Sequence, residues 1–508
     1  MIGRISLKKS TFPQNSEVLV LPVAEGDLAI LKKLDPKAAK SLQDKIKKFD
    51  FKGKAGEALS TENVGSHKRL VLLGTGKKEK LTSIIFREKL ADVIRRLRDE
   101  KAYSMELYLA DLLLTEEAGK NIGLALHLSN YSFIKYRGEK TKKQHHEVKE
   151  LTVFVPLGAS ADAVKKFETG LTLAEALAEG IYLSRDLVNE PASHVGASEL
   201  VDAAKAIEKE SKGNIKVEVL EEAECRKLGM GSYLGVAQGS EQKPKFIVIR
   251  AKTSAGAKKK ICIIGKSIVF DTGGLSLKPP KAMMDMKFDM AGGAAVLGFF
   301  KVLTRDPALF SELSKKAEIV GILPACENMP SGKAMRPGDI VTALNGKTIE
   351  ALNTDAEGRM TLADALSYAE KHLKSDYIVD LATLTGACIV ALGEDLAGLF
   401  ANDKEFGKLF REAADTTGEG IWPLPLYKPY LKGMKNGIAD LKNIRGSGYG
   451  GAITGALFLS EFVEKAKWIH VDISGPAFRE QGPVGILPRG ATGWGVLTLI
   501  EFLKRIVN

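Results

Sequence analysis

Ionisable residues concentrate in two glycine-rich segments of this sequence. The first segment, 265–296, reads GKSIVFDTGGLSLKPPKAMMDMKFDMAGGAAV, and the second, 353–366, reads NTDAEGRMTLADAL. Two lysines and four carboxylates stand out among their ionisable residues, namely Lys266, Lys278, Asp271, Asp289, Asp355 and Glu357. A lone carboxylate at a strand end is usually a helix cap or a surface charge, so Asp289 alone could cap the following helix. Likewise, Arg359 alone could pair with Asp364. The combination of these groups is what indicates a site.

Four carboxylates that converge on one pocket need cations to remain ionised. If Asp271, Asp289, Asp355 and Glu357 meet, two divalent metal ions cancel their charge. Oxygen ligands suit zinc, manganese, magnesium or cobalt. Two such ions polarise a carbonyl group and deprotonate a water molecule, which is hydrolytic chemistry. The residues alone therefore predict a two-metal hydrolase, and they leave peptides, phosphate esters and amides open as substrates.

The elements that must position these groups are predicted from hydrophobic patterns. Apolar runs that alternate with helical patterns occupy 245–251, 260–270, 317–325, 376–384 and 468–475. This alternation predicts a mostly parallel sheet that is covered by helices on both faces. Ligands of such sheets bind at the carboxyl ends of the strands. The polar residues singled out above fall at strand ends, as this rule requires.

The first third of the chain has a similar pattern. Strand-like runs occupy 16–26, 68–76, 105–113 and 151–158, and an amphipathic helical stretch occupies 81–101. This order predicts a separate α/β domain.

One long helical pattern, 160–189, ends before Pro191 and is expected to join two domains. The predicted fold class is α/β, with two domains that are each a mostly parallel sheet flanked by helices, joined by this helix. The predicted limits are 1–159 for the N-terminal domain, 160–190 for the linker helix and 191–508 for the domain that carries the site.

Composition restricts the function classes. Hydrophobic residues make up 44% of the chain and charged residues 27%, which excludes a disordered or fibrous protein. No apolar run approaches the roughly 18 residues that span a bilayer, so no membrane partner is expected. The N-terminal sequence MIGRISLKKSTFPQ is charged where a signal peptide is apolar. The four cysteines lie far apart and fit a reducing compartment, and a cytoplasmic location is therefore expected.

Two features suggest nucleic-acid or nucleotide binding. The formal net charge is +11, but segment 135–149 alone carries six Lys or Arg against two Glu. A solvated linker explains this local excess, and DNA binding stays open as an alternative. Residues 446–451 fit the pattern GxGxxG, with Asp472 about 20 residues further on. The preceding segment is not an apolar strand, which argues against a dinucleotide site.

Five strings resemble successive motifs of the leucyl (cytosol) aminopeptidase family: GKSIVFDTGGLSLKP, MKFDMAGGAAV, PACENMPSGKAMRPGDI, NTDAEGRMTLADAL and ATLTGA. The resemblance covers the chain from about residue 187 to its C-terminus, while the N-terminal third is similar only in pattern and length. It implies a metallo-exopeptidase, a hydrolase that removes the N-terminal residue of peptides and prefers Leu or other apolar first residues. The segment 191–508 would then be a catalytic di-metal peptidase domain.

The same resemblance implies two divalent metal ions per subunit, with manganese or zinc expected ahead of magnesium or cobalt. One metal, the more labile, would be held by Asp271, Asp355 and Glu357. The tighter metal would be held by Lys266, Asp271, Asp289 and Glu357. A water molecule or hydroxide would bridge the two ions.

The remaining roles also come from the resemblance. Lys278 would stabilise the oxyanion of the tetrahedral intermediate, and Arg359 would hold a bicarbonate ion that acts as general base. An apolar pocket for the first side chain would be lined by Met286, Thr383, Leu384 and Gly386. The family is homohexameric, and some bacterial relatives also bind DNA. A two-metal phosphoesterase and a DNA-binding protein are kept as alternatives.

Overall fold

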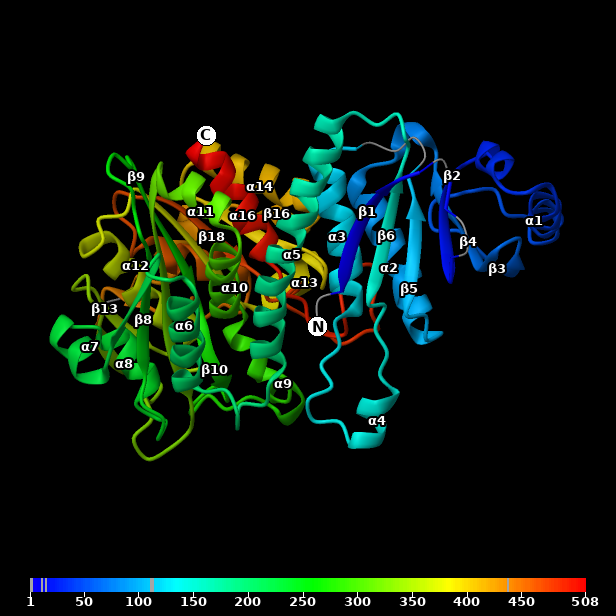
Figure 1. Cartoon of the computed structure of the whole chain (residues 1–508). Coiled ribbons are helices and arrows are strands. Elements are labelled where there is room, and N and C mark those ends of the chain that lie inside the picture. Colours follow the sequence, from blue (N-terminus) through cyan, green and yellow to red (C-terminus); the bar gives the residue numbers. More distant parts are fainter. Residues whose placement is uncertain (1–2, 11, 14–15, 110–113, 436–437) are drawn as a thin grey trace. The chain divides into compact units, whose positions relative to one another are not determined.

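The computed structural model describes residues 3–10, 12–13, 16–109, 114–435 and 438–508 (Figure 1). The chain has an α/β fold with two compact units, which confirms the predicted fold class. None of the described helices combines the length and the apolar character that a membrane crossing needs.

The first unit comprises Met1–Glu179 and Gln481–Arg489, and the second comprises Gly180–Glu480 and Gly490–Asn508. The division falls inside α5 (Ala161–Asn189), so this long helix contributes to both units. The domain limits stated above, at residues 159 and 190, stay a prediction.

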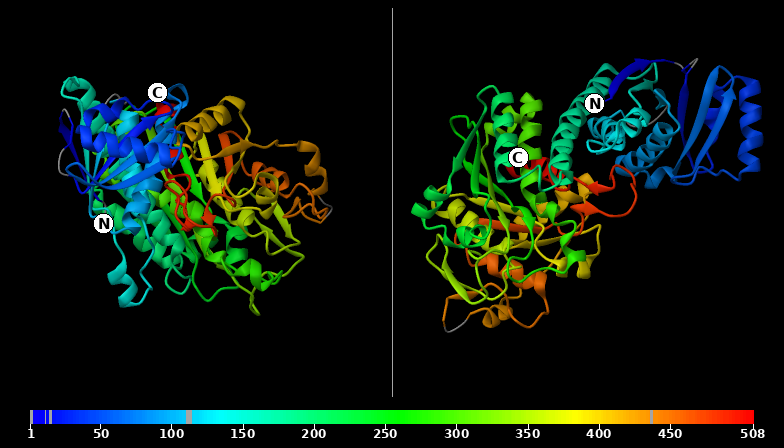
Figure 2. Two further views of the ribbon diagram at one scale, coloured as in Figure 1. Left: turned by 90° about the vertical axis from the view of Figure 1, so that its right-hand side faces the viewer. Right: turned by 90° about the horizontal axis from the view of Figure 1, so that it is seen from below.

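A six-stranded sheet of order β1-β6-β5-β2-β4-β3 forms the first unit, which can be followed in blue and cyan in Figure 2. Its strands are β1 (Arg4–Lys9), β2 (Val18–Ala24), β3 (Ala58–Val64), β4 (His67–Gly76), β5 (Ser104–Tyr108) and β6 (Glu150–Val155). Only the pairing of β3 with β4 is antiparallel. Its helices are η1 (Ala29–Lys33), α1 (Pro36–Lys48), η2 (Lys78–Lys80), α2 (Ser83–Asp99), α3 (Glu116–Asn130) and α4 (Glu139–Gln144).

The strands and helix predicted for this region are present. For the run predicted at 105–113, the structure has β5 up to Tyr108, and residues 110–113 lie outside the described part of the chain. Helix α2 begins after Thr82, whose hydroxyl accepts a hydrogen bond from the backbone of Ile85. Its buried residues Leu90, Ile94 and Leu97 recur every three or four positions, as expected for the buried face of an amphipathic helix.

The second unit is built on a nine-stranded sheet in which β16-β15-β18-β14-β9-β11-β8-β7 are neighbours and β10 pairs with β11. Its strands are β7 (Ile215–Leu220), β8 (Lys245–Ala251), β9 (Lys259–Gly265), β10 (Ser267–Asp271), β11 (Ala317–Asn328), β14 (Tyr377–Ala382), β15 (Ala397–Ala401), β16 (Ile421–Pro423) and β18 (Lys467–Asp472). The central strands β18, β14, β9 and β11 run parallel.

Helices cover this sheet. They include α6 (Ala197–Glu210), α8 (Gly231–Ala237), α10 (Ala291–Arg305), α12 (Gly358–Lys371), α14 (Lys404–Thr417), α15 (Gly451–Ser460) and α16 (Val496–Val507). Helix α10 packs on β9 and β14, α6 packs on β8, and α12 packs on β9 and β11 (Figure 1). In β9, Cys262 and Ile264 join the core cluster of α12, while Ile261 and Ile263 are equally buried. Burial on both faces of the sheet explains why this strand is a continuous apolar run in the sequence.

The predicted strand 260–270 is divided at Lys266 into β9 and β10. The backbone N–H of Lys266 donates to the carbonyl of Leu381 at 2.9 Å, and its carbonyl accepts from the N–H of Gly293 at 2.8 Å. The backbone of Lys266 is thereby fixed between β14 and the start of α10. A Cβ at Gly292 would lie 2.1 Å from the carbonyl oxygen of Leu381, so only glycine allows this helix to start so close to the strands.

Candidate metal centre

Asp271 is the last residue of β10 and lies at the carboxyl end of the central strands. Its partner in the parallel ladder is Asn328, the last residue of β11. The Asp271 Oδ1 atom accepts hydrogen bonds from Asn328 Nδ2 at 2.7 Å and from the backbone N–H of Gly273 at 2.8 Å. Its Oδ2 atom forms an ion pair with Lys278 Nζ at 2.8 Å.

A tight turn returns the chain from Asp271 to Lys278. Gly273 and Gly274 have φ angles of +85° and +62°, a region that favours glycine. A Cβ at Gly273 would also lie 2.8 Å from Asp355 Oδ1. The turn places Lys278 Nζ 2.5 Å from the same Asp355 oxygen, so this lysine bridges two carboxylates.

Asp289 enters the site from the short helix η3 (Met286–Met290), directly before α10. It does not cap α10, because the N-cap position is Met290. The Asp289 Oδ1 atom accepts hydrogen bonds from Lys266 Nζ at 2.8 Å and from the Thr383 hydroxyl at 2.7 Å. Its other oxygen, Oδ2, is buried and has no hydrogen-bond partner among the residues that the structure describes.

Glu357 immediately precedes α12 and is buried. Its Oε1 atom lies 2.9 Å from Lys266 Nζ. The lysine amine therefore sits between Glu357 and Asp289, and it also donates to the carbonyl of Thr383 at 2.9 Å. A Cβ at Gly358 would lie 2.4 Å from Lys266 Cε, so glycine at this position leaves space for the lysine side chain.

The structure thus brings together all six groups that the sequence singled out. Ligand atoms of Asp271, Asp289 and Glu357 lie within 4.8 Å of one another. Asp355 is linked to this cluster through Lys278 and is less buried, with 31% of its side chain exposed. Four carboxylates face two lysine cations, which leaves two negative charges without compensation by these lysines.

Electrostatics follow from this crowding. Burial raises the pKa of Asp289 well above its usual value, and the charges of Glu357 and Asp271 add to the effect. Burial also raises the pKa values of Asp271 and Asp355. Burial opposes the charged form of Lys266, but the surrounding carboxylates outweigh burial and raise the pKa of its amine. Positive charge inside this cluster is strongly favoured.

These residues fit divalent metal ions. The unpaired Asp289 oxygen and the uncompensated negative charge both call for further cations, and carboxylate oxygens are suitable ligands for them. Asp271, Asp289, Asp355 and Glu357 could supply oxygen ligands. Lys266 could supply a nitrogen ligand only after losing its proton, because an ammonium group has no lone pair to donate.

Arg359 lies in the first turn of α12 and is buried. Its Nη1 atom donates to the backbone carbonyl of Asn443 at 2.8 Å, and its Nε atom has no hydrogen-bond partner. Burial lowers the pKa of Arg359 to about 10, although the charges of Glu357 and Asp472 act in the opposite direction. Asp364 accepts instead from the backbone N–H groups of Tyr233 and Leu344, so it is not the partner of Arg359.

The four residues expected to line a substrate pocket lie in two places. Thr383 and Leu384 follow β14, and Gly386 begins α13 (Gly386–Leu392). Thr383 is bonded to Asp289, whereas the half-buried Leu384 packs against the apolar core. Met286 is half-buried at the start of η3, three residues before Asp289.

Sequence reasoning assigned no role to two further residues. Asn328 holds the Asp271 carboxylate and also donates to the Thr354 carbonyl. Asp472, the last residue of β18, is fully buried and accepts from the backbone N–H of Leu384 at 3.2 Å and from the Thr385 hydroxyl at 2.7 Å. Asp472 therefore positions the segment after β14. Both residues are the last residues of apolar strands, and this position in the sequence could have marked them as candidate site residues.

The fold and the acidic centre together define a metal-dependent hydrolase. A model of the catalytic domain of the cytosol aminopeptidase family matches residues 182–500, and a model of the N-terminal domain of that family matches residues 20–140. The chain belongs to the cytosol aminopeptidase family. It is a metal-dependent aminopeptidase that acts on peptides.

Individual relatives are similar to this chain over more than nine-tenths of their length. The chain is 39% identical over 503 residues to a probable cytosol aminopeptidase of Microcystis aeruginosa, with 98% of each chain covered. It is 42% identical over 486 residues to one of Gloeobacter violaceus, with 92% of each covered.

Two solved structures have similar folds. One is a mutant of tomato leucine aminopeptidase, with a TM-score of 0.83 and 33% identity over 99% of this chain and 97% of that chain. The other is the bottromycin maturation enzyme BotP in complex with manganese. It has a TM-score of 0.82 and 30% identity, with 97% of this chain and 100% of that chain covered.

Proposed function

We propose that this enzyme removes Leu and other apolar residues from the N-termini of peptides, using two divalent metal ions per chain. The observation that carries the proposal is the buried cluster of Asp271, Asp289 and Glu357, whose ligand atoms lie within 4.8 Å of one another. Asp289 retains an oxygen without a partner in this cluster, and such a buried charged oxygen is costly unless a cation satisfies it.

Each metal has a proposed ligand set. Asp271, Asp355 and Glu357 would hold the more labile ion, and Lys266, Asp271, Asp289 and Glu357 would hold the tighter one. Manganese or zinc is proposed ahead of magnesium or cobalt, and the manganese in the BotP structure supports that order. When bound, the two ions would make the scissile carbonyl more electrophilic, acidify the attacking water molecule and accept the free α-amine of the substrate.

Lys278 is proposed to act on the transition state. Its ammonium group lies 2.8 Å from Asp271 and 2.5 Å from Asp355, and only 14% of its side chain is exposed. Burial opposes its charge, but Asp271 and Glu357 outweigh burial and raise its pKa, so the group is a cation at neutral pH. A fixed cation stabilises the oxygen that becomes negative when water adds to the peptide carbonyl.

Arg359 is proposed to hold bicarbonate as the general base. The Asp and Glu groups of the centre and Lys266 are proposed as metal ligands and Lys278 as the cation at the oxyanion, so none of them is assigned to accept the water proton. The guanidinium group of Arg359 is buried and its Nε–H is unpaired, as expected for a group that binds a small anion.

Substrate preference is proposed to come from Met286, Thr383, Leu384 and Gly386. The side chains of Met286 and Leu384 are both half-buried, so each keeps apolar surface available to a ligand. Asp472 holds Leu384 in place through its backbone N–H. An apolar pocket favours an apolar first residue because binding removes its surface from water.

The assembly and location are further parts of the proposal. A homohexamer is proposed from family membership, and sedimentation of the purified protein measures it. A cytoplasmic location is supported by the names of the relatives and by the four cysteines, which are all free and buried. Neither DNA binding nor a phosphoesterase activity is supported by the comparisons, because the relatives are named aminopeptidases.

Hydrolysis of a leucyl peptide and of the same peptide with an acetylated N-terminus tests the proposed activity. The free peptide should be cleaved, a chelator should stop cleavage, and manganese or zinc should restore it. The acetylated peptide should resist cleavage under all conditions. Equal turnover of the two peptides would contradict an exopeptidase. Hydrolysis of an aryl phosphate in place of a leucyl anilide would favour the phosphoesterase alternative.

A further inference from the structure

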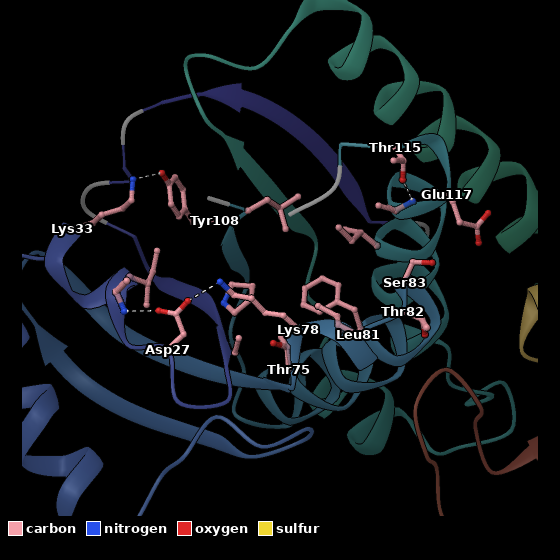
Figure 3. Close-up of a pocket in the computed structure, with 18 residues that line it drawn as sticks. Asp27, Lys33, Thr75, Lys78, Leu81, Thr82, Ser83, Tyr108, Thr115 and Glu117 are labelled. Carbon is pink, nitrogen blue, oxygen red and sulfur yellow. Dashed lines mark hydrogen bonds and ion pairs between the residues drawn. The ribbon is translucent and has the colours of Figure 1, made fainter. Parts of the chain in front are cut away.

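A cavity of about 630 Å³ lies in the first unit at the carboxyl ends of β2, β4 and β5 (Figure 3). Pro22 and Ala24 line it from β2, Thr75 from β4 and Tyr108 from β5. Its volume is in the range of about 300–1,000 Å³ that is typical of small-molecule sites. None of the residues of the acidic centre lines this cavity.

The cavity coincides with a topological switch point of the sheet. Strands β2 and β5 are neighbours, but the chain leaves them in opposite directions. After β2 it continues through α1 to β3 and β4 on one side, and after β5 it continues through α3 and α4 to β6 on the other side. Diverging connections open a crevice at the carboxyl ends of the two strands, where open α/β sheets bind ligands.

The interior of the cavity is mostly apolar. Ile30, Leu81, Phe86, Leu109 and Ile122 all line it. Phe86, Leu109 and Ile122 are buried, so they form a fixed floor. A ligand with an apolar body would be stabilised here because binding removes its surface from water.

The charged residues of the lining are Asp27, Lys33, Lys78 and Glu117, whose formal charges cancel, but they are not all paired with one another. Asp27 forms an ion pair with Lys78 at 2.8 Å, and Glu117 forms one with Lys120 at 2.6 Å. Lys33 Nζ donates to the Tyr108 hydroxyl at 3.1 Å and lies 5.4 Å from the centre of its ring. Among the described residues, no carboxylate pairs with Lys33.

The far side of the cavity is formed by the first turns of two helices. Figure 3 shows Lys33 and Tyr108 on one side and Ser83, Thr115 and Glu117 on the other. Helices α2 and α3 both begin at that second side, after the capping residues Thr82 and Thr115. Helix N-termini carry partial positive charge. At α3 this partial charge is opposed by Glu116 and Glu117 in the first turn, so the preference for an anion rests on Lys33.

We propose that this cavity binds a small organic anion with an apolar body. Its negative group would lie beside Lys33, and its apolar body would lie over Phe86 and Ile122. This site is separate from the acidic centre and adds a ligand-binding function to peptide hydrolysis. A carboxylate and a phosphate monoester share the required chemistry.

Calorimetric titration of the full-length enzyme distinguishes these anions. The probes are naphthoate, naphthyl phosphate and the uncharged naphthalenemethanol, which have the same ring system. We expect one or both anions to bind more tightly than the alcohol, and the tighter anion identifies the preferred negative group. Lys33→Gln should weaken anion binding about tenfold and leave alcohol binding unchanged. Lys32→Gln is the matched control, because this exposed neighbour does not line the cavity and its loss should have no effect.

A second variant, Ala118→Trp, fills the cavity from the first turn of α3. It should abolish binding of all three probes and leave hydrolysis of leucyl anilide unchanged, which also reports that the enzyme is folded. The proposal is overturned if the parent enzyme shows no saturable anion binding. It is also overturned if Lys33→Gln and Lys32→Gln bind the anions equally, or if active Ala118→Trp enzyme binds them as the parent does. The last outcome would assign the anions to the acidic centre, and failure of any of these tests leaves the aminopeptidase assignment intact.

Discussion

Both sheets of this enzyme present a polar or hollow region at the carboxyl ends of parallel strands, and the two regions differ in chemistry. In the second unit, Asp271, Asp289 and Glu357 crowd their carboxylates together and require cations. In the first unit, the same edge of the sheet is an apolar cavity in which Lys33 has no carboxylate partner within the described part of the chain. The backbone architecture therefore supplies the location of a site, while the side chains at the strand ends decide its chemistry.

If the acidic centre is the catalytic site, loss of one of its carboxylates should abolish hydrolysis. Asp289→Ala should lower kcat at least about a thousandfold and lower the metal content, because metal ions contribute several kcal/mol to such reactions. Metal analysis and hydrolysis of leucyl anilide measure both effects. Asp306→Ala is the matched control, because Asp306 only caps α11 (Pro307–Ser314) and its loss should cost about 1 kcal/mol of stability. Full activity of Asp289→Ala would place the reaction elsewhere.

Removal of the Lys278 side chain should lower the rate of hydrolysis without lowering the metal content. Lys278→Ala should lower kcat about 10²- to 10³-fold, the usual effect of removing one donor to an oxyanion. Its metal content should equal that of the parent, because the variant retains every proposed ligand. Lys281→Ala, an exposed lysine of the next helix, serves as the control. If Lys278→Ala purified without metal, its role would be structural.

The side chains of the acidic centre are closely packed, unlike those around the cavity. Substitution of Gly358 tests whether this close packing is needed for activity. A Cβ at this position would lie 2.6 Å from Lys266 Nζ, which is fixed between Asp289 and Glu357. Gly358→Ala should therefore displace the lysine and lower kcat about 10²-fold, as expected for a misplacement of about 1 Å. Gly332→Ala, whose Cβ would meet nothing within 4 Å, should retain full activity. Equal activity of these two variants would indicate that the position of Lys266 is unimportant.

In the first unit, protonation of His127 should lower the free energy of unfolding and leave hydrolysis unchanged. Burial lowers the pKa of His127 to about 4, whereas an unfolded histidine titrates near 6.5. Between these pH values the unfolded state binds more protons, so acid favours unfolding. The unit should have its full stability above pH 6.5 and lose about 3 kcal/mol as the pH falls to 4.

Hydrogen exchange of the α3 amides between pH 7 and 4.5 measures this loss, after correction for the intrinsic exchange rate. His127→Gln should remove the pH dependence without changing hydrolysis at pH 7, and His146→Gln should retain it. An unchanged pH dependence in His127→Gln would assign the acid sensitivity to another group.

Much of the acidic centre could be predicted from the sequence because its members are charged residues beside apolar runs. The residues that were missed have weaker signals. Asn328 is a neutral amide whose role appears only when β10 and β11 pair in register. Asp472 was considered only as the acidic residue that follows the GxGxxG pattern. Its actual role depends on hydrogen bonds to the segment after β14.

The fold was predictable to a similar degree. Apolar runs predicted the strands, but the break at Lys266 depends on hydrogen bonds to Leu381 and Gly293, which lie far away in the sequence. The cavity of the first unit could not be predicted, because it is formed by side chains from three strands and four helices whose relative positions the sequence pattern does not give.

Measurement of metal content together with activity tests directly whether hydrolysis depends on two bound metal ions. The enzyme would be stripped with a chelator and reconstituted with increasing manganese, and each sample would be analysed for bound metal and for hydrolysis of leucyl anilide. We predict that activity rises with bound metal and reaches its plateau at two ions per chain. Asp289→Ala should reach neither this metal content nor this activity. Hydrolysis at the full rate in enzyme that contains no stoichiometric metal would contradict this prediction.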